Sequence, residues 1–561
     1  MVVLELLALG GISLLGSRMA KRKKDKEKEA AHSGKMEHPA QTVVPIPVEI
    51  TQTPAQIKRD LRLSGAALVL STTGLLAGAP LLAIMSMPSL VCVAWPTLRT
   101  AVSGLRAGTI NDESHKAVRV VFCLTTGLFV VAAIDLALQT AVKRKLLETE
   151  LAFKDRLAVL LGHPSESVWI MREGVEVEMP LYQVETGTSV VLNTGDIAPL
   201  PGVVVTGKGR VRPVLATDSE GEAIQEGDSI PNGYVVTEGS IEVRLEHYPA
   251  VIPDIRQEME HAATGKTNLV KLGVQSGTRS APWMMGAFVA GLPLLGFNHS
   301  AVFLTTRMGM QMNEIGPHTA RQAITAGLEH GIFIRDMAAL ERANTCNTIV
   351  FDAALLHQPA AAAIIPNLVT ELRNRKWATG VGIPRQFALY AMVDSEAEGR
   401  KLLETYALDD YFKEPLEWGR SQLLKNLQQA GRNVCYVGLP GKGDKAMKEC
   451  ALSVAWCHDG LPRQSAATML LAGAHLPDLA SLFDLAKAFA TRQTTSFLTP
   501  LGVDMLNLTV NIFLNYGLLN SVVISHAASL LDVSGSGFVK REAITRKQDE
   551  PTSGEEKPVI R

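Results

Sequence analysis

Residues 348–356 read TIVFDAALL, a short run of β-branched and aromatic residues that ends on a carboxylate. Between Ile332 and Ala486, further runs of this kind alternate with stretches of helical character. The predicted strands are 348–351, 388–393, 433–437 and 451–455, and the predicted helices are 396–406, 421–430 and 445–449. Strands that alternate with helices are typical of a parallel, doubly wound sheet. We therefore predict an α/β, Rossmann-like domain over residues 332–490.

The chain as a whole is unusually apolar. It has 561 residues, of which 47% are hydrophobic, and its mean hydropathy of +0.13 is high for a purely soluble protein. Apolar runs long enough to enter a bilayer recur along the sequence. They predict a membrane anchor at 1–18, a linker at 19–62, transmembrane helices within 63–145, transmembrane hairpins at 281–313 and 497–531, and a disordered tail at 534–561.

A second soluble domain is predicted over residues 146–275. After a charged helix, short alternating strands follow from Glu166 to His247 and are separated by turn sequences such as Asn232-Gly233. Basic clusters such as 143–145 flank the membrane runs, and the positive-inside rule places them in the cytoplasm. We expect both soluble domains on the cytoplasmic side of a bacterial inner or plasma membrane, with the lipid bilayer as a partner.

Charge and cysteine content exclude several classes of function. The 55 Lys and Arg residues balance 56 Asp and Glu residues, so no basic field for nucleic acid is present. The six cysteines show no C-x-x-C spacing, which argues against a zinc ribbon or a disulfide framework.

Several segments resemble motifs of the P-type ATPases, in particular the heavy-metal-transporting, copper-type members. Residues 195–205 (GDIAPLPGVVV) and 226–228 (EGD) resemble the actuator domain of that family. Residues 331–334 (GIFI), 340–342 (LER) and 348–352 (TIVFD) resemble the approach to its phosphorylated aspartate, which corresponds to Asp352 here. The resemblance implies a multi-domain membrane protein: an α-helical transmembrane bundle, an inserted β-rich actuator-like domain and a haloacid-dehalogenase-like α/β domain.

The catalytic motifs of that family are altered in this chain. The DKTGT sequence of the family corresponds to residues 352–356, which read DAALL here. The lysine and both threonines, whose ammonium and hydroxyl groups would bind a γ-phosphate, are therefore absent. The GDGIND loop corresponds to residues 438–443 (GLPGKG), so the carboxylates that hold Mg²⁺ are absent, although Asp444 lies one position further on. Asp218 stands in place of the glutamate of the TGES loop, and Asp394 matches the TGD turn. For both Asp352 and Asp394, a structural role as a cap at a strand end is favoured over a catalytic role. Residues 353–392 are too short for an independent adenine-binding module.

The membrane site of the family is altered as well. Its CPC triplet corresponds to Met308-Gly309-Met310, in which thioethers suit Cu(I) and Gly309 loosens the helix. Asn507 and Asn511 match family asparagines and share a helix face with Asp504 and Asn515. These residues predict either a metal pathway or, alternatively, methionines that fill space and asparagines that join helices.

The leading hypothesis is therefore a pseudo-ATPase with a metal-binding or regulatory role. It would bind Cu(I) or a protein partner, whereas binding of Mg²⁺ and ATP is not expected. One alternative is a divergent, active ATP-driven copper or heavy-metal transporter. A second is a membrane scaffold that uses its soluble domains as interaction surfaces.

Overall fold

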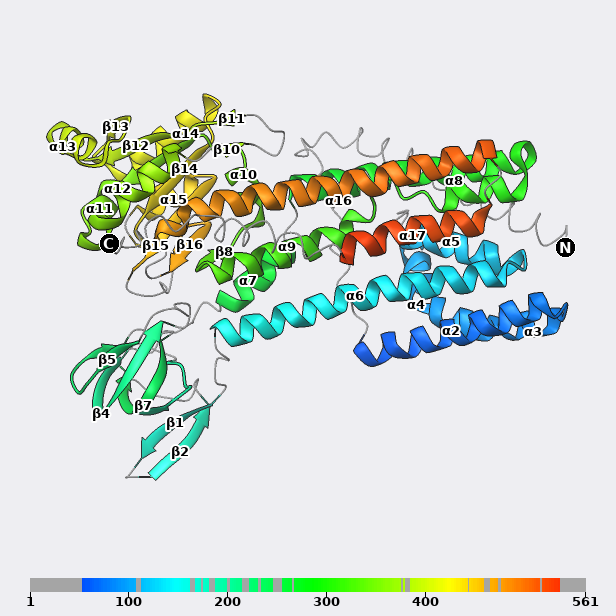
Figure 1. The fold of residues 1–561 in the computed structure, drawn as a ribbon, viewed down its shortest axis with the longest axis horizontal. Helices are drawn as coiled ribbons and strands as arrows, with labels where there is room; N and C mark the ends of the chain where they lie inside the picture. Colours follow the sequence, from blue (N-terminus) through cyan, green and yellow to red (C-terminus); the bar gives the residue numbers. More distant parts are fainter. Residues whose placement is uncertain are drawn as a thin grey trace, which may run out of the picture. The chain divides into compact units, whose positions relative to one another are not determined.

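The computed structural model describes residues 53–534 apart from short gaps (Figure 1). The gaps are residues 107–111, 162–166, 173–174, 181–186, 199–201, 214–220, 231–233, 246–254, 265–266, 375–376, 379–383, 442, 459–464, 473–475 and 515–516. The predicted anchor, most of the linker, almost all of the tail and Asp218 lie outside the described residues. The chain divides into two compact units. Unit 1 comprises residues up to Leu147, Leu269–Ile315 and Thr495–Ser534, and unit 2 comprises the remainder.

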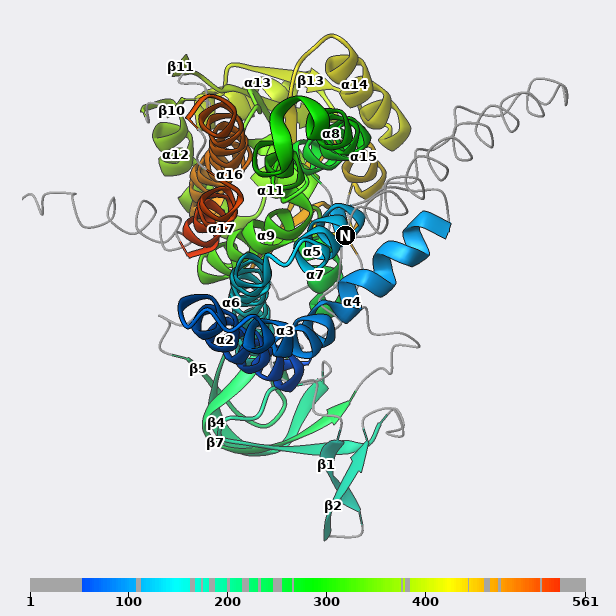
Figure 2. The ribbon, with the colours of Figure 1, turned by 90° about the vertical axis from the view of Figure 1, so that its right-hand side faces the viewer.

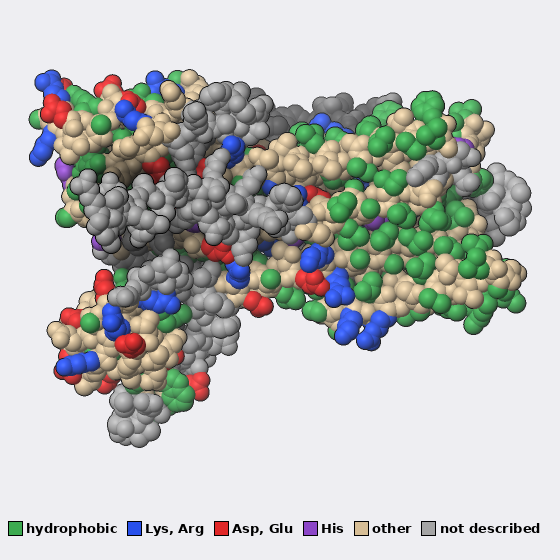
Figure 3. All heavy atoms as spheres, in the orientation of Figure 1, with side chains coloured by type: hydrophobic (Ala, Val, Ile, Leu, Met, Phe, Trp, Pro, Cys, Tyr) green, Lys and Arg blue, Asp and Glu red, His purple; other side chains and the backbone are tan. Residues whose placement is uncertain are grey.

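Unit 1 is helical. Its elements are α2 (Pro54–Leu76), α3 (Pro80–Met85), α4 (Met87–Arg106), α5 (Asp112–Thr125), the first part of α6 (Phe129–Leu161), α8 (Asn268–Ser300), the 3₁₀ turn η2 (Ala301–Leu304), the start of α9 (Met312–Glu329), the end of α16 (Leu479–Leu514) and α17 (Leu518–Ser534). Figure 2 shows α2, α6 and α17 nearly end on. Among the described helices, four are long and apolar enough to cross a membrane: Pro80–Arg106, Asn268–Phe297, Leu476–Leu514 and Gly517–Ser534. Hydrophobic side chains cover much of the visible face of these helices (Figure 3).

Helices of this unit extend beyond three predicted boundaries. Helix α2 starts at Pro54, within the predicted linker, because Thr53 caps it and exchanges hydrogen bonds with Gln56. Helices α8 and α16 start well before the predicted hairpins 281–313 and 497–531. Apolar runs indicate only the part of a helix that suits lipid, whereas both of these helices continue through more polar sequence.

The first domain of unit 2 is an antiparallel β structure. Its strands are β1 (Ser167–Arg172), β2 (Val175–Pro180), β3 (Ser189–Asn193), β4 (Gly202–Pro213), β5 (Glu222–Ile224), β6 (Ser229–Ile230) and β7 (Tyr234–Leu245). They pair in the order β2-β1-β3-β7-β4-β5, with β6 also on β4. Gly207 has φ +105° and lies so close to β7 that a Cβ would be 2.4 Å from the Ser240 carbonyl oxygen. Only glycine fits at this point, where the antiparallel pairing of the two long strands β4 and β7 is irregular.

The α/β domain follows. Its strands are β8 (Ile332–Ile334), β9 (Thr348–Asp352), β12 (Ala388–Val393), β13 (Asp410–Lys413), β14 (Val434–Gly438), β15 (Leu452–Cys457) and β16 (Met469–Ala472). They form one sheet in the order β13-β12-β9-β14-β15-β16-β8. All neighbours are parallel except β16 and β8. Strands β9, β14 and β15 are buried throughout, as expected for a sheet covered on both faces.

The helices of this domain complete the predicted alternation. They are α10 (Met337–Ala343), α11 (Ala353–Leu356), α12 (Pro359–Asn374), α13 (Glu396–Tyr406), α14 (Glu417–Gln429) and α15 (Asp444–Glu449). Strand β12 and helix α13 have the predicted bounds. Between β9 and β12 the described chain contains α11, α12 and a two-residue pairing of β10 (Trp377–Ala378) with β11 (Pro384–Arg385). The predicted architecture of a helical bundle with an inserted β-rich domain and an α/β domain is confirmed.

Candidate functional site

The first candidate site surrounds Asp352 in the α/β domain. Asp352 is the last residue of the central strand β9 and caps helix α11, whose Ala354 N–H donates to its Oδ1 at 2.8 Å. The residue is only 2% exposed. The carboxyl ends of parallel strands are where such sheets place their ligands. Asp352 therefore occupies a typical functional position, but it also serves the structural role of a helix cap.

Arg420, which the sequence did not single out, connects Asp352 to Asp394. From helix α14 its Nη1 donates to Asp352 Oδ2 at 2.9 Å, and its Nη2 donates to Asp394 Oδ1 at 2.5 Å. Its Nε donates to the Glu414 carbonyl oxygen at 2.9 Å, which fixes the guanidinium plane. Asp394 is the more exposed partner, since 63% of its side chain is accessible against 3% for Asp352. The two predicted aspartates, Asp352 and Asp394, are therefore bridged by the guanidinium of Arg420.

Tyr436 closes the other side of Asp352. It lies on β14, directly beside β9 in the sheet, and its hydroxyl donates to Asp352 Oδ2. The residue is fully buried. Burial, together with the adjacent Asp352 carboxylate, raises the pKa of Tyr436 well above its ordinary value, so the phenol keeps its proton and remains a donor. Three donors, from Ala354, Arg420 and Tyr436, therefore engage both oxygens of Asp352.

The glycine loop after β14 packs against this site. Gly443 has φ +75°, and a Cβ there would lie 3.1 Å from the Tyr436 hydroxyl and 3.5 Å from Asp352 Oδ2. Asp444 is the half-buried first residue of α15. Its Oδ1 is buried and has no hydrogen-bond partner among the described residues.

The second candidate site lies in unit 1, where the chain is not helical between η2 and α9. Met308 and Gly309 have φ of +47° and +93°, so the predicted loosening at Gly309 is confirmed. We call residues 305–311, between η2 and α9, the open segment. Asp504 from α16 holds it by accepting hydrogen bonds from the backbone N–H groups of Arg307 at 3.0 Å and Met308 at 3.3 Å. Ser525 also donates to Asp504, at 3.1 Å.

The methionines of this segment pack against glycines of α8. A Cβ on Gly277 would lie 2.3 Å from Met310 Cγ, and one on Gly273 would lie 2.7 Å from Met312 Cγ. Met310 is 5% exposed and Met312 is fully buried. These contacts are those expected of side chains that fill space between closely packed segments.

The asparagines of α16 make hydrogen bonds within the bundle. Asn507 Nδ2 donates to the carbonyl oxygen of Ser521 on α17 at 3.0 Å and to its hydroxyl at 2.8 Å. Asn511 Nδ2 donates to the carbonyl and side-chain oxygens of Asn507, both at 3.1 Å. Asn515 lies outside the described residues. Asn507 thus joins α16 to α17, whereas the Oδ1 of Asn511 is buried with no partner among the described residues.

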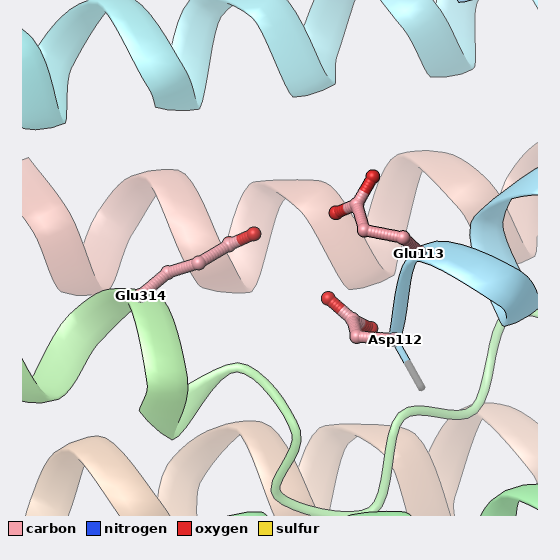
Figure 4. Close-up of side chains that lie close together, drawn as sticks. All are labelled: Asp112, Glu113 and Glu314. Carbon is pink, nitrogen blue, oxygen red and sulfur yellow. The ribbon is translucent and has the colours of Figure 1, made fainter. Parts of the chain in front are cut away.

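Unit 1 also contains ion pairs, formed by a buried lysine and partly buried carboxylates, that the sequence did not predict. Lys116 Nζ lies 2.8 Å from Asp112, 3.0 Å from Glu113 and 2.7 Å from Glu314. Figure 4 shows that the three carboxylates approach one another from the starts of α5 and α9. Arg307 pairs with Asp112 at 2.6 Å. The spacing of Asp112 and Lys116, four residues apart, was the available signal.

A second buried group centres on Asp135 of α6. Its Oδ1 accepts Arg119 Nη2 at 2.8 Å and faces His526 Nε2 at 2.7 Å, and its Oδ2 accepts Arg119 Nε at 3.0 Å. Asp135 and Arg119 are 1% and 2% exposed. Charged residues within an apolar sequence were the signal for this site, because such residues normally face the interior of a bundle.

Comparison with known proteins agrees with the motifs. Residues 163–250 match the family of P-type ATPase actuator domains. A copper-exporting P-type ATPase B of Archaeoglobus fulgidus is 26% identical over 208 residues, which are 34% of this chain and 29% of that protein. A probable copper-exporting P-type ATPase V of Mycobacterium tuberculosis is 23% identical over 292 residues, which are 48% of this chain and 38% of that protein.

Among solved structures, a zinc-transporting PIB-type ATPase in an E2.Pi state aligns with 86% of this chain and 99% of its own, at 15% identity and a TM-score of 0.45. The sequence matches each span less than two fifths of the length of the two copper ATPases. They relate this chain to the heavy-metal P-type ATPases.

Proposed function

We propose that this relative of the heavy-metal P-type ATPases is a pseudo-ATPase, with a metal-binding or regulatory role in the membrane. The observation that carries the proposal is that Ala354, Arg420 and Tyr436 donate hydrogen bonds to both oxygens of Asp352. A carboxylate that attacks a γ-phosphate needs a free oxygen, together with Mg²⁺ to neutralise the phosphate charge. Here both oxygens accept hydrogen bonds, and Arg420 neutralises the carboxylates instead.

The neighbouring positions support the same reading. Mg²⁺ requires oxygen ligands in near-octahedral geometry. The loop facing Asp352 offers Leu439 and Gly443 where the family carries carboxylates. Asp394, the other predicted acid, is bound to Arg420 at 2.5 Å. Asp444 has one oxygen without a hydrogen-bond partner among the described residues, which is too few ligands for a magnesium site on its own.

The direct test is phosphorylation. The full-length protein in lipid nanodiscs, given Mg²⁺ and ATP labelled at the γ-phosphate, is expected to acquire no acid-stable label with or without Cu(I) or Zn²⁺. Asp352→Asn is the matched control, because the amide retains an acceptor oxygen but cannot form an aspartyl phosphate. The proposal would be wrong if label appears on the wild-type protein and is absent from this variant.

If the protein is instead a divergent active transporter, the wild-type protein should acquire the acid-stable label and should hydrolyse ATP in a metal-dependent manner. The scaffold alternative predicts neither hydrolysis nor bound metal.

Copper binding by the open membrane segment is the second part of the proposal. The favouring observations are the non-helical Met308 and Gly309 and the unpartnered Oδ1 of Asn511. Thioether sulfur prefers Cu(I) to Zn²⁺. We expect Met308→Leu/Met310→Leu to lose most of the copper measured in purified wild-type protein, while each swap costs less than about 1.5 kcal/mol of stability. Met505→Leu, an exposed methionine of α16, is the control. Equal copper in all three proteins would leave the methionines with a packing role.

A further inference from the structure

A small cavity lies within unit 1, beside the non-helical segment before α9. Its volume is about 10 Å³, and its walls include Arg119, Arg307, Gln311, Asp504, Ser525 and His526. This volume is close to that needed by one water molecule. Eight of the ten residues that line it are polar or charged, so groups that can hydrogen-bond to a water molecule are present.

Gln311 is a lining residue with an unsatisfied polar atom. The residue is 2% exposed, and its Oε1 is buried without a hydrogen-bond partner among the described residues. An unsatisfied buried acceptor costs about 1–3 kcal/mol. A water molecule in the cavity removes this cost by donating to Gln311.

His526 faces the same cavity and is held in one orientation. It is 6% exposed, and its Nε2 lies 2.7 Å from Asp135 Oδ1. Because Asp135 also accepts two bonds from Arg119, it is an ionised carboxylate and Nε2 carries the hydrogen. The other ring nitrogen, Nδ1, is then the atom that can take up a proton.

Groups of both charges surround His526: the Asp135 carboxylate favours a proton on the ring, whereas burial and the guanidiniums of Arg119 and Arg307 disfavour one. The facing groups are Asp135 on α6, Arg119 on α5, Arg307 on the segment before α9 and Asp504 on α16. Among the described residues, the wider network, in which Asp112, Glu113 and Glu314 are only partly buried, contains more acids than bases. Its acids are Asp112, Glu113, Asp135, Glu314 and Asp504, and its bases are Lys116, Arg119 and Arg307. A surplus of negative charge in a low-dielectric interior is unfavourable, and a proton on His526 reduces it.

We propose that His526 and the adjoining cavity form a proton-binding site in the helical unit, with water as the proton carrier. Hydronium in the cavity transfers its proton to Nδ1, which leaves water in the cavity and an imidazolium whose Nε2–H remains on Asp135. Protons thereby enter a network that also touches the open segment, because Asp504 both lines the cavity and holds Arg307 and Met308.

The experiment is nuclear magnetic resonance of full-length protein with isotope-labelled histidine side-chain nitrogens in nanodiscs, between about pH 5 and pH 8. One signal, absent from His526→Gln, is expected to pass from the Nε2–H tautomer to the doubly protonated ring. His299→Gln, at an exposed residue of α8, should retain that signal unchanged. A His526 signal that stays in one protonation state across the range overturns the proposal.

Two further variants keep the test decisive if His526→Gln does not fold. Asp135→Asn keeps the acceptor for Nε2 but removes the charge, so the midpoint of the same signal should shift. Gln311→Leu removes the acceptor for cavity water, and the titration should be lost or become slow. An unchanged titration in both variants contradicts the site described. None of these outcomes depends on ATP chemistry, so they are separate from the test of the pseudo-ATPase.

Discussion

Replacing Arg119 with methionine is expected to lower the free energy of unfolding of the helical unit by about 3–5 kcal/mol, because it leaves Asp135 as an uncompensated buried charge. Asp135 is 1% exposed and receives two of its hydrogen bonds from Arg119. Methionine fills a similar space without a donor. The measurement is denaturant-induced unfolding of the full-length protein in mixed micelles.

Arg279→Met is the matched control for this experiment. Arg279 is an exposed residue of α8, and a surface substitution of this kind should change stability by no more than about 0.5 kcal/mol. The double variant Arg119→Met/Asp135→Leu should recover part of the loss, because it removes the unpaired charge. A single variant as stable as the control would show that Asp135 does not depend on Arg119.

Replacing Arg420 with alanine is expected to destabilise the α/β domain by about 3–5 kcal/mol, for the same physical reason. Asp352 is 2% exposed and would keep only the neutral donors Ala354 and Tyr436. Thermal unfolding followed by a domain-specific probe, such as hydrogen exchange in β9 and β14, measures the effect. The stability of Arg420→Lys should lie between that of the wild-type protein and that of Arg420→Ala, since one ammonium does not reproduce a guanidinium that bridges two carboxylates.

Arg400→Ala serves as the control in this domain, because Arg400 is exposed on helix α13. The double variant Arg420→Ala/Asp352→Asn should be more stable than Arg420→Ala alone, since the amide needs no cationic partner. Equal stability of Arg420→Ala and Arg400→Ala would show that the ion bridge is not what holds Asp352.

The two units share one feature of their clustered carboxylates. In the α/β domain Arg420 lies between Asp352 and Asp394, and in unit 1 Lys116 lies among Asp112, Glu113 and Glu314. In each case a side chain of the protein supplies the positive charge that a bound cation would otherwise supply. For the α/β domain this arrangement favours the proposed loss of phosphoryl transfer.

The sequence by itself determined the architecture. Strand β12 and helix α13 follow directly from the alternation of apolar runs with Ser395-capped helical sequence, and the actuator-like strands follow from their turn residues. The apolar sequence that follows Asp352, on which the proposal of a pseudo-ATPase draws, was also visible in the sequence alone, because it depends only on which residues are present. The open segment at Gly309 was predicted from the residue that permits it.

Only the tertiary structure decided which side chains complete the sites. Arg420 is 68 residues from Asp352, and His526 is 391 residues from Asp135. No spacing rule connects positions so far apart, because their contact depends on how strands and helices pack rather than on the period of either. The start of α2 at Pro54 similarly required the cap at Thr53 to be weighed against a charged sequence. Local patterns specify the elements, whereas partners for buried charges are selected when those elements come together.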